Sequence, residues 1–199
     1  MKKMLKFLLK LINLMARSVI DAGSYFIRKT WLERYVKGVT MHILKDNYLF
    51  FLLSVFIIFV DQLTKYIAVI FYTELVHGIE IFSFLNLVFV TNKGISFGLL
   101  SNLNISFFLG LISLAISMVL IFWLTKSSKV YEKFTLSLIL GGALGNGIDR
   151  IYQSYVIDFI DFHYKGYHWP AFNVADTFIT IGVIIYIIYN LNEALFLKK

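Results

Sequence analysis

Nine acidic, basic and amide residues could do chemistry in a sequence of which 59% of the residues are hydrophobic. Ionisable side chains at membrane depth are costly, and they persist mainly where they line a site or pair with one another. Asp158 and Asp176 form the pair with the clearest chemistry. Two close carboxyls in a desolvated site share a proton, so the ionised one can activate water while the protonated one donates to a carbonyl oxygen. The nine residues are Asp61, Lys65, Asn92, Asn146, Asp149, Arg150, Asp158, Asn173 and Asp176.

Several of these residues also have a structural interpretation. Asp176 lies near the start of a predicted helix, where the helix dipole favours a carboxylate. Asp61 and Lys65 are four residues apart with the acid first, the favourable order for a helical salt bridge, and we interpret this pair as structural. Arg150 could bind phosphate or peptide carbonyls, or it could anchor a helix end. Spacing alone leaves these interpretations open.

A metal site is conceivable around His163 and His168, which lie five residues apart and near Asp158 and Asp161. Two histidines in an aromatic loop are also typical of side chains at a membrane interface, and we predict no metal site and no cofactor. The chain has no cysteine, which excludes disulfides, thiolate catalysis and thiolate metal sites.

The composition indicates a protein that crosses a membrane several times. Only 16% of the 199 residues are charged, against about 25% in soluble domains, and the mean hydropathy is +0.76. The net charge of +7 resides in the first 47 residues, and the remaining residues sum to zero. Nothing in the body of the chain therefore predicts nucleic-acid binding.

Four apolar runs approach the ~20 residues needed to cross the hydrocarbon core. We predict a four-transmembrane-helix bundle with spans at about residues 48–72, 105–124, 131–151 and 172–190, in one membrane domain over residues 47–195. Lys and Arg are frequent before the first span, between the second and third spans, and at the C-terminus. The positive-inside rule then places both termini in the cytoplasm, and all nine polar residues reach the outer boundary of the membrane.

The two outer connections are rich in aromatic and β-branched residues, over residues 79–91 and 155–163. Such segments are typical of short strands. We therefore expect a small β-sheet platform on the outer, periplasmic side of the bundle, where an extended peptide could bind as an added strand. Glycines at 141, 142 and 145 in the third span permit close helix packing.

Residues 1–46 form a basic N-terminal extension. Leu5, Leu8, Ile12, Met15 and Val19 recur at helical spacing, with basic residues off that stripe, which is typical of an amphipathic helix on an anionic leaflet. The lack of a small-x-small cleavage site argues against a cleaved signal peptide. Two alternatives stay open: a poorly ordered extension, and a true start at Met41.

Five short blocks lie in order across the membrane domain, between Asp61 and Gly182. Together they resemble the lipoprotein signal peptidase family, the bacterial signal peptidase II, and five blocks in this order are strongly specific. They are Asp61-Gln62-Leu63-Thr64-Lys65, Asn92-Lys93-Gly94-Ile95-Ser96-Phe97-Gly98, Gly141-Gly142-Ala143-Leu144-Gly145-Asn146-Gly147-Ile148-Asp149-Arg150, Val156-Ile157-Asp158-Phe159 and Phe172-Asn173-Val174-Ala175-Asp176.

The resemblance implies an intramembrane aspartic endopeptidase of the bacterial inner membrane, with Asp158 and Asp176 as its catalytic pair. The implied substrate is a prolipoprotein whose cysteine carries diacylglycerol and which is cut just before that cysteine. We expect a monomer whose other partners are membrane lipids. The resemblance assigns substrate positioning to Asn92, Asn146, Arg150 and Asn173, and support of the fold or the site to Asp61, Lys65 and Asp149.

The sequence departs from the family pattern at two places. Ser154 stands where the family usually has a glycine shortly after the Asp-Arg pair, and the N-terminal extension is about 40 residues longer than a typical member needs. Two other function classes remain alternatives. An ion-coupled transporter would have its polar residues nearer the bilayer midplane and often repeated halves, while a non-catalytic assembly factor or lipid-binding scaffold would need no paired aspartates.

Overall fold

The structure of this protein is a computed structural model that describes residues 31–94 and 105–196. The chain divides into two compact units, Met1–Asp46 and Asn47–Lys199. The amphipathic helix predicted between Leu5 and Val19 lies outside the described residues, as does the part of the Asn92–Gly98 block from residue 95 onward. The second unit contains the candidate site.

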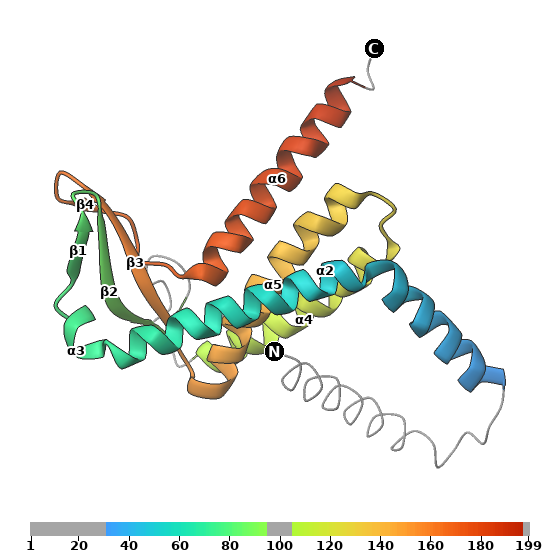
Figure 1. The fold of residues 1–199 in the computed structure, drawn as a ribbon, viewed down its shortest axis with the longest axis horizontal. Coiled ribbons are helices and arrows are strands. Elements are labelled where there is room, and N and C mark those ends of the chain that lie inside the picture. Colours follow the sequence, from blue (N-terminus) through green and yellow to red (C-terminus); the bar gives the residue numbers. More distant parts are fainter. Residues whose placement is uncertain (1–30, 95–104, 197–199) are drawn as a thin grey trace. The chain divides into compact units, whose positions relative to one another are not determined.

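Helices make up most of the described chain (Figure 1). An apolar segment in a bilayer must satisfy its own backbone hydrogen bonds, so it becomes a helix. Among the described residues, three stretches are long and apolar enough to cross a membrane, and they match the first, second and fourth predicted spans within a few residues: Asp46–Ile70, Ser106–Lys126 and Val174–Glu193. The helices are α2 (Trp31–Ile70), α3 (Tyr72–Leu75), α4 (Ser106–Lys126), α5 (Val130–Gln153) and α6 (Val174–Phe196).

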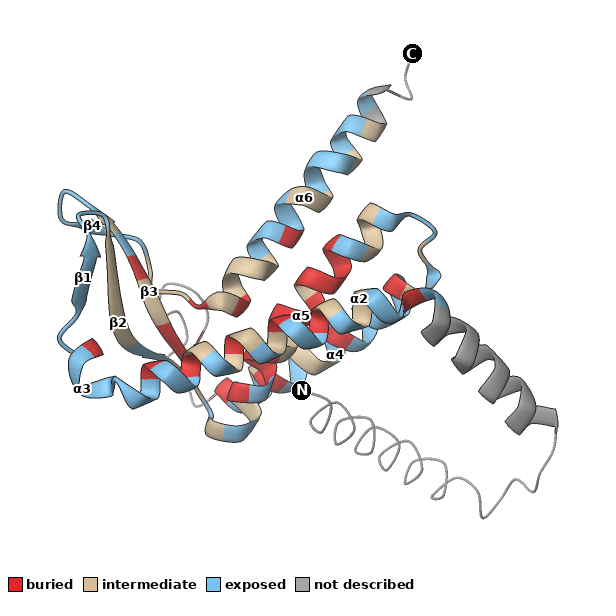
Figure 2. Cartoon of the chain, in the orientation of Figure 1, coloured by how far each residue is buried: buried red, intermediate tan, exposed pale blue. Residues whose placement is uncertain are grey.

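Helix α5 covers the third predicted span but is more polar than the other long helices, and it is not among those three apolar stretches. Its polar residues Asn146 and Asp149 are buried. Figure 2 shows that buried positions are dense along α5 and sparse on the outward faces of its neighbours. The lower apolarity of α5 thus reflects polar side chains that it buries against other parts of the protein.

Serine hydroxyls join α5 to the helices on either side. Ser54 on α2 donates to the carbonyl oxygen of Ser137 on α5 at 2.9 Å, and Ser113 on α4 donates to that of Ala143 at 2.6 Å. Small hydroxyl residues allow helix backbones to approach closely, and such bonds are worth about 0.6–2 kcal/mol in a membrane. Three helices are thereby held at short separation.

Two glycines of α5 make room for the start of α6 and for a carboxylate of α2. A Cβ atom at Gly142 would collide with the carbonyl oxygen of Ala175, and one at Gly145 would lie 2.7 Å from Oδ2 of Asp61. The predicted role of this glycine cluster in close packing is confirmed. Its consequence is that Asp61 and the first turn of α6 reach the same stretch of α5.

A four-stranded antiparallel sheet with the order β1-β2-β3-β4 lies beside the end of α2 (Figure 1). The expectation of strands at 79–91 and 155–163 is confirmed, with the first segment divided into a hairpin. A two-residue turn with positive φ at Lys165 and Gly166 leads into β4, a geometry that matches the twist of a hairpin. The strands are β1 (Ile79–Phe82), β2 (Leu85–Asn92), β3 (Val156–Tyr164) and β4 (Tyr167–His168).

One face of the sheet packs on the last turns of α2 and on α3. Ile157 of β3 forms a buried cluster with Ala68 and Leu75. Phe89 and Tyr72 add an edge-to-face ring contact at 4.9 Å. These contacts attach the sheet to the helices, and β3 carries Asp158 from the sheet toward them.

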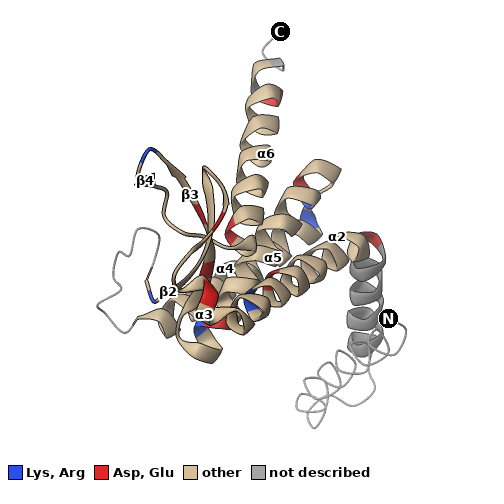
Figure 3. Ribbon diagram, turned by 60° about the vertical axis from the view of Figure 1, so that its left-hand side comes forward, with Lys and Arg blue, Asp and Glu red and all other residues tan. Residues whose placement is uncertain are grey.

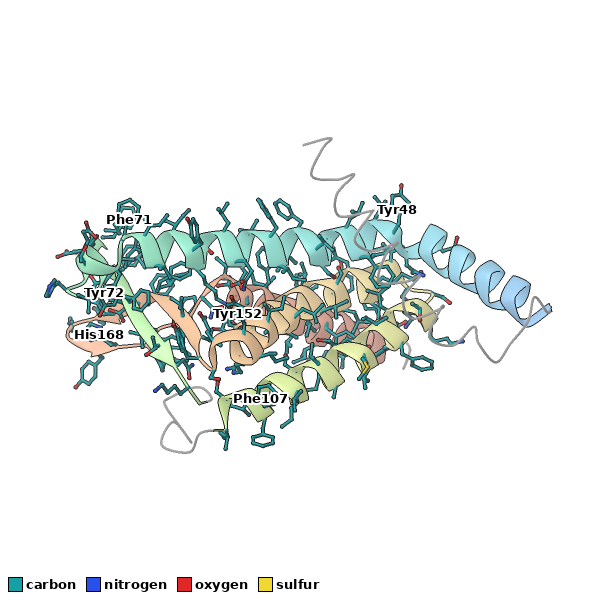
Figure 4. All side chains as sticks on the ribbon, turned by 90° about the horizontal axis from the view of Figure 1, so that it is seen from below. Tyr48, Phe71, Tyr72, Phe107, Tyr152 and His168 are labelled. Atoms are coloured by element: carbon teal, nitrogen blue, oxygen red, sulfur yellow. The ribbon has the colours of Figure 1, made fainter. Side chains whose placement is uncertain are left out.

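Exposed aromatic side chains mark both ends of the apolar part of α2. Tyr48 lies at one end, and Phe71 lies beside Tyr72 at the other (Figure 4). At 1.5 Å per residue, Tyr48 and Phe71 are about 35 Å apart along the helix, which is close to the ~30 Å of a hydrocarbon core. Tyrosine and other amphipathic rings concentrate at membrane–water boundaries, so this spacing fits a membrane-crossing helix.

Ser154 ends α5 in the left-handed region, with φ 62° and ψ 21°. A left-handed residue lets the chain turn sharply after a helix, and glycine is the usual residue there because it has no Cβ to clash. Only Tyr155 separates this residue from β3. The glycine that the family usually has after the Asp-Arg pair is therefore explained by the backbone at Ser154.

We predict that Ser154→Gly stabilises the protein, because a non-glycine residue in the left-handed region costs about 1–2 kcal/mol. The thermal unfolding midpoint of the purified protein in detergent should rise relative to wild type. Ser154→Val, which adds a β-branched side chain at the same φ, should lower it. A lower midpoint for Ser154→Gly than for wild type, or a higher one for Ser154→Val, would show that the backbone at Ser154 is not strained.

Candidate active site

Asn173 caps helix α6 and fixes the position of Asp176. The Oδ1 atom of Asn173 accepts the backbone N–H of Asp176 at 2.9 Å, and the carboxylate of Asp176 accepts the backbone N–H of Asn173 at 3.4 Å. This reciprocal pair is a capping box. Asp176 does occupy the helix-terminal place that its sequence position indicates, and the same place turns its second oxygen toward α5.

Asp158 lies on β3 and is only 2% exposed. Its two carboxylate oxygens accept amide N–H groups from Asn173 at 2.6 Å and from Asn92 at 3.0 Å. The pKa of Asp158 is raised from 3.8 to about 6, first because burial disfavours the charged form and second because of the negative charge of Asp176, while the two amide hydrogen bonds lower it. The two aspartates therefore interact through their charges.

Asn146 on α5 connects the residues around both aspartates. Its Nδ2 donates to Oδ1 of Asp176 at 2.7 Å, and its Oδ1 accepts the amide of Asn173 at 3.2 Å. Since Asn173 also donates to Asp158, one pair of amides bridges the two carboxyls. Carboxylates held by amides from fixed elements keep their separation and orientation without help from solvent.

Lys65 lies behind these amides, 3% exposed, at the centre of an ionic cluster. Its ammonium donates to Asp61 at 2.8 Å, to Asp149 at 2.5 Å and to Oδ1 of Asn146 at 2.9 Å. Gln62 donates to the other oxygen of Asp149 at 2.9 Å. The predicted salt bridge between Asp61 and Lys65 is confirmed, and Asp149 extends it from α2 to α5.

Asp61 also holds the start of α6. Its Oδ1 accepts the backbone N–H of Ala175 at 2.9 Å, one of the first N–H groups of that helix, which have no partner within the helix itself. A carboxylate at a helix N-terminus is favoured by the dipole. The ionic cluster thus fixes the element that carries Asp176.

Arg150 lies one helical turn beyond Asn146 and donates from Nη2 to the carbonyl oxygen of Gly94 at 3.2 Å. Its charge interacts with those of Asp158 and Asp176. Among the described residues, the buried Nε atom of Arg150 has no hydrogen-bond partner. A guanidinium beside two carboxyls, with a donor unused, can bind a carbonyl or other oxygen of a bound molecule.

The whole arrangement carries more negative than positive charge. Four carboxyls and two cationic side chains share the site, so full ionisation would leave −2. Figure 3 shows acidic positions on β3 and at the start of α6 close to one another, in a ribbon that is otherwise mostly uncharged. An excess of buried negative charge favours retention of a proton. The raised pKa of Asp158 is consistent with this excess of negative charge.

All nine residues singled out in the sequence come together in this site, although eight of them come from five different helices and strands and Asn173 directly precedes α6. The nine are Asp61, Lys65, Asn92, Asn146, Asp149, Arg150, Asp158, Asn173 and Asp176. Sequence reasoning missed Gln62, which donates to both Asp61 and Asp149. The one sequence feature that could have identified Gln62 was its position next to Asp61 in the first block.

The histidines lie elsewhere on the sheet. The rings of His163 and His168 stack with centroids 5.1 Å apart, and Nδ1 of His168 lies 2.9 Å from the carboxylate of Asp161. Among the described residues, no group of three or more His, Asp or Glu side chains is arranged to hold a metal ion.

Known proteins are similar to this chain in sequence over most of its length. A lipoprotein signal peptidase of Francisella tularensis subsp. novicida (strain U112) is 45% identical over 165 residues, which cover 80% of this chain and 99% of that protein. A lipoprotein signal peptidase of Coxiella burnetii (strain Dugway 5J108-111) is 47% identical over 144 residues, which cover 70% of this chain and 87% of that protein.

The fold has a solved counterpart as well. A bacterial membrane enzyme solved at 2.3 Å resolution by the in meso method superimposes with a TM-score of 0.64 and 37% identity, over 72% of this chain and 87% of that one. The family model described as signal peptidase (SPase) II matches residues 53–192, a range that includes every residue of the site. The chain is a bacterial membrane protein that belongs to the signal peptidase II family.

Proposed function

We propose that this protein is an intramembrane aspartic endopeptidase that removes the signal peptide from diacylglyceryl-modified prolipoproteins, cutting before the lipidated cysteine. The single observation that carries the proposal is the pairing of Asp158 with Asp176. Their carboxyls interact through their charges, and the amides of Asn146 and Asn173 link them. The lipoprotein signal peptidases that this chain resembles supply the substrate class.

The geometry supports general acid–base hydrolysis. The ionised carboxylate of the pair takes a proton from a water molecule, whose oxygen attacks the scissile carbonyl carbon, while the protonated carboxyl donates to the carbonyl oxygen. The tetrahedral intermediate then breaks at the carbon–nitrogen bond, and the amino group of the cysteine leaves with a proton from the pair. Because the charges of Asp158 and Asp176 interact, the dyad acts in this mechanism as one acid–base group.

The polar side chains around the pair have two proposed roles. Asn92, Asn146 and Asn173 orient the carboxyls and offer amide groups to the peptide, and Arg150 binds a substrate carbonyl with its unused N–H. Asp61, Lys65 and Asp149 hold α2, α5 and α6 in register behind them. This division rests on the contacts of each group, since the first four touch or face the carboxyls and the last three form the cluster behind the amides.

We place the protein in the inner membrane with four spans, and α5 is the third of them along the chain. Helix α5 has 24 residues, enough to cross a bilayer, and its polar side chains are covered by its neighbours. Lys126, Lys129 and Lys133 near the α4–α5 connection mark the cytoplasmic side. Both termini are then cytoplasmic, and the dyad and the sheet lie at the periplasmic face.

An outer-leaflet site suits a lipid-modified substrate. The two acyl chains can stay in the bilayer while the peptide on either side of the cysteine reaches the carboxyls between the sheet and the helix ends. No metal or cofactor enters this chemistry, and we propose that the enzyme works as a monomer. The transporter and scaffold alternatives predict no cleavage by the purified protein.

We predict that Asp158→Asn and Asp176→Asn each abolish cleavage of a diacylglyceryl-modified prolipoprotein by the purified full chain, because each removes one half of the proton exchange. The rate should fall by about 10³-fold or more, the range expected when an essential acid–base group is lost. Glu80→Gln, which neutralises an exposed carboxylate on β1, is the matched control and should retain activity. Wild-type-like turnover in either aspartate variant would refute the dyad, and failure of folded wild type to cleave would favour the alternatives.

The raised pKa of Asp158 predicts a pH-dependent effect on stability. The folded state binds this proton more tightly than the unfolded chain, so the resulting stabilisation is full below about pH 3.8 and is lost as the pH rises through about 6. Asp158→Asn removes that titration. The thermal unfolding midpoint of Asp158→Asn minus that of wild type should therefore increase as the pH rises from acidic to neutral. A difference that stays flat across this range would show that Asp158 has an ordinary pKa.

The N-terminal extension should not be needed for cleavage. The family match begins at residue 53, and none of the site residues lies before Asp61. A chain that begins at Met41 should therefore cleave the same prolipoprotein with kcat and KM close to those of the full chain. Loss of cleavage by a truncated chain that still unfolds cooperatively would show that the extension takes part in catalysis.

A further inference from the structure

A second polar cluster ties three strands of the sheet together. The carboxylate of Asp161 on β3 accepts an amide N–H from Asn86 on β2 at 3.1 Å. The same carboxylate lies 2.9 and 3.0 Å from Nδ1 of His168 on β4. The side chain of Asp161 is 9% exposed and that of His168 is 53% exposed. We call these three residues the sheet clasp.

The sheet clasp lies on the face of the sheet opposite the dyad. Asp161 follows Asp158 by three residues on β3, and side chains alternate between the faces of a strand. We assign the hydrogen of this contact to Nδ1 of His168, with the carboxylate of Asp161 as the acceptor. The sheet clasp thus links strands on the face of the sheet that does not carry Asp158.

The sheet clasp fastens the segment that joins the two aspartates along the chain. After the turn at Lys165 and Gly166, the chain runs back along β3, where Trp169 donates its N–H to the carbonyl of Phe162 at 2.8 Å. Phe172 then exchanges backbone hydrogen bonds with Ile160 at 2.9 and 3.0 Å. Strand β4 itself has only two residues, and so short a pairing is marginal without side-chain support.

The returning segment ends at the dyad. Phe172 is followed by Asn173, whose amide donates to Asp158 and whose Oδ1 caps the helix of Asp176. A shift of this segment along β3 would therefore move the amide away from one carboxyl and displace the other. Misplacement of catalytic groups by about 1 Å can cost up to ~10²-fold in rate.

We propose that Asp161 and His168 are positioning residues for the reaction. Their hydrogen bond holds residues 167–173 on β3 and so keeps Asn173 and Asp176 in place against Asp158. This inference rests on the proposed peptidase function for its kinetic consequence and on the hydrogen bonds alone for its structural one. The effect falls on kcat, because the sheet clasp sets the geometry of the reacting groups and does not contact the substrate.

The kinetic test compares five forms of the full-length protein on a diacylglyceryl-modified prolipoprotein: wild type, His168→Ala, His168→Asn, Asp161→Ala and the double alanine variant. His168→Ala should lower kcat about tenfold, the loss expected for one hydrogen bond to a charged group, with little change in KM. His168→Asn, whose amide can occupy the place of Nδ1, should recover most of the rate. The double variant should be no slower than the slower single variant, because both remove one interaction.

The matched control is Tyr167→Ala, which alters the same strand at a side chain that is 83% exposed, and its kcat should equal that of wild type. Unchanged kcat in His168→Ala would overturn the inference. It would also be overturned if His168→Asn were folded and as slow as His168→Ala, or if the two alanine variants lost activity independently. A general folding defect is recognised by a lowered thermal midpoint that His168→Asn shares.

A measurement without substrate separates this inference from the proposed function. Amide hydrogen exchange in detergent should speed up at Ile160, Trp169 and Phe172 in His168→Ala and return toward wild type in His168→Asn. Absence of cleavage by wild type, together with this exchange pattern, would refute the peptidase function and leave the sheet clasp standing. Cleavage by wild type with unchanged exchange and unchanged kcat in His168→Ala would refute the sheet clasp and leave the function standing.

Discussion

The ammonium group of Lys65 is the interaction on which the site depends. A charge withdrawn from water costs several kcal/mol unless partners surround it, and Lys65 has two carboxylates and an amide oxygen at 2.5–2.9 Å. Those partners belong to α2 and α5, and through Asp61 the cluster also reaches the first turn of α6. The three helices must therefore meet at this point for the charge to be tolerated. Neutralisation of this buried lysine therefore requires the helices that carry much of the candidate site to come together.

The same distribution of charge sets the electrostatic environment of Asp158 and Asp176. Asp61 and Asp149 use the ammonium group of Lys65, so they leave little positive charge for Asp158 and Asp176 beyond that of Arg150. Amide groups fill the remaining contacts, and an amide orients a carboxylate without supplying a full charge. The pair is thus both fixed in place and short of counter-charge. Burial and this shortage of counter-charge raise the pKa of Asp158 to about 6, well above that of a solvated aspartate.

The elements and the site could be predicted from the sequence to different extents. Apolar runs located α2, α4 and α6, and the i, i+4 spacing of Asp61 and Lys65 predicted their salt bridge, since both signals are local. Local patterns cannot show that Lys65 also reaches Asp149, or that Gln62 joins them, because those contacts depend on how helices pack. The nine site residues were found largely through the five sequence blocks of the family. Strand β4 and the partnership of Asp161 with His168 were missed, since two residues leave no periodic pattern and the contact crosses a hairpin.

The capping box at the start of α6 has a consequence for the lifetime of the assembled site. Helix ends are the parts of a helix that open most readily, and the carboxylate of Asp176 is itself one of the bonds that prevent such fraying. Each opening of the first turn would withdraw Asp176 and the amide of Asn173 in a single event. For the proposed dyad, this means that one carboxyl and the amide that holds the other carboxyl leave the site together. The free energy of locally unfolding one helical turn therefore sets the fraction of time for which Asp176 and Asn173 are both in place.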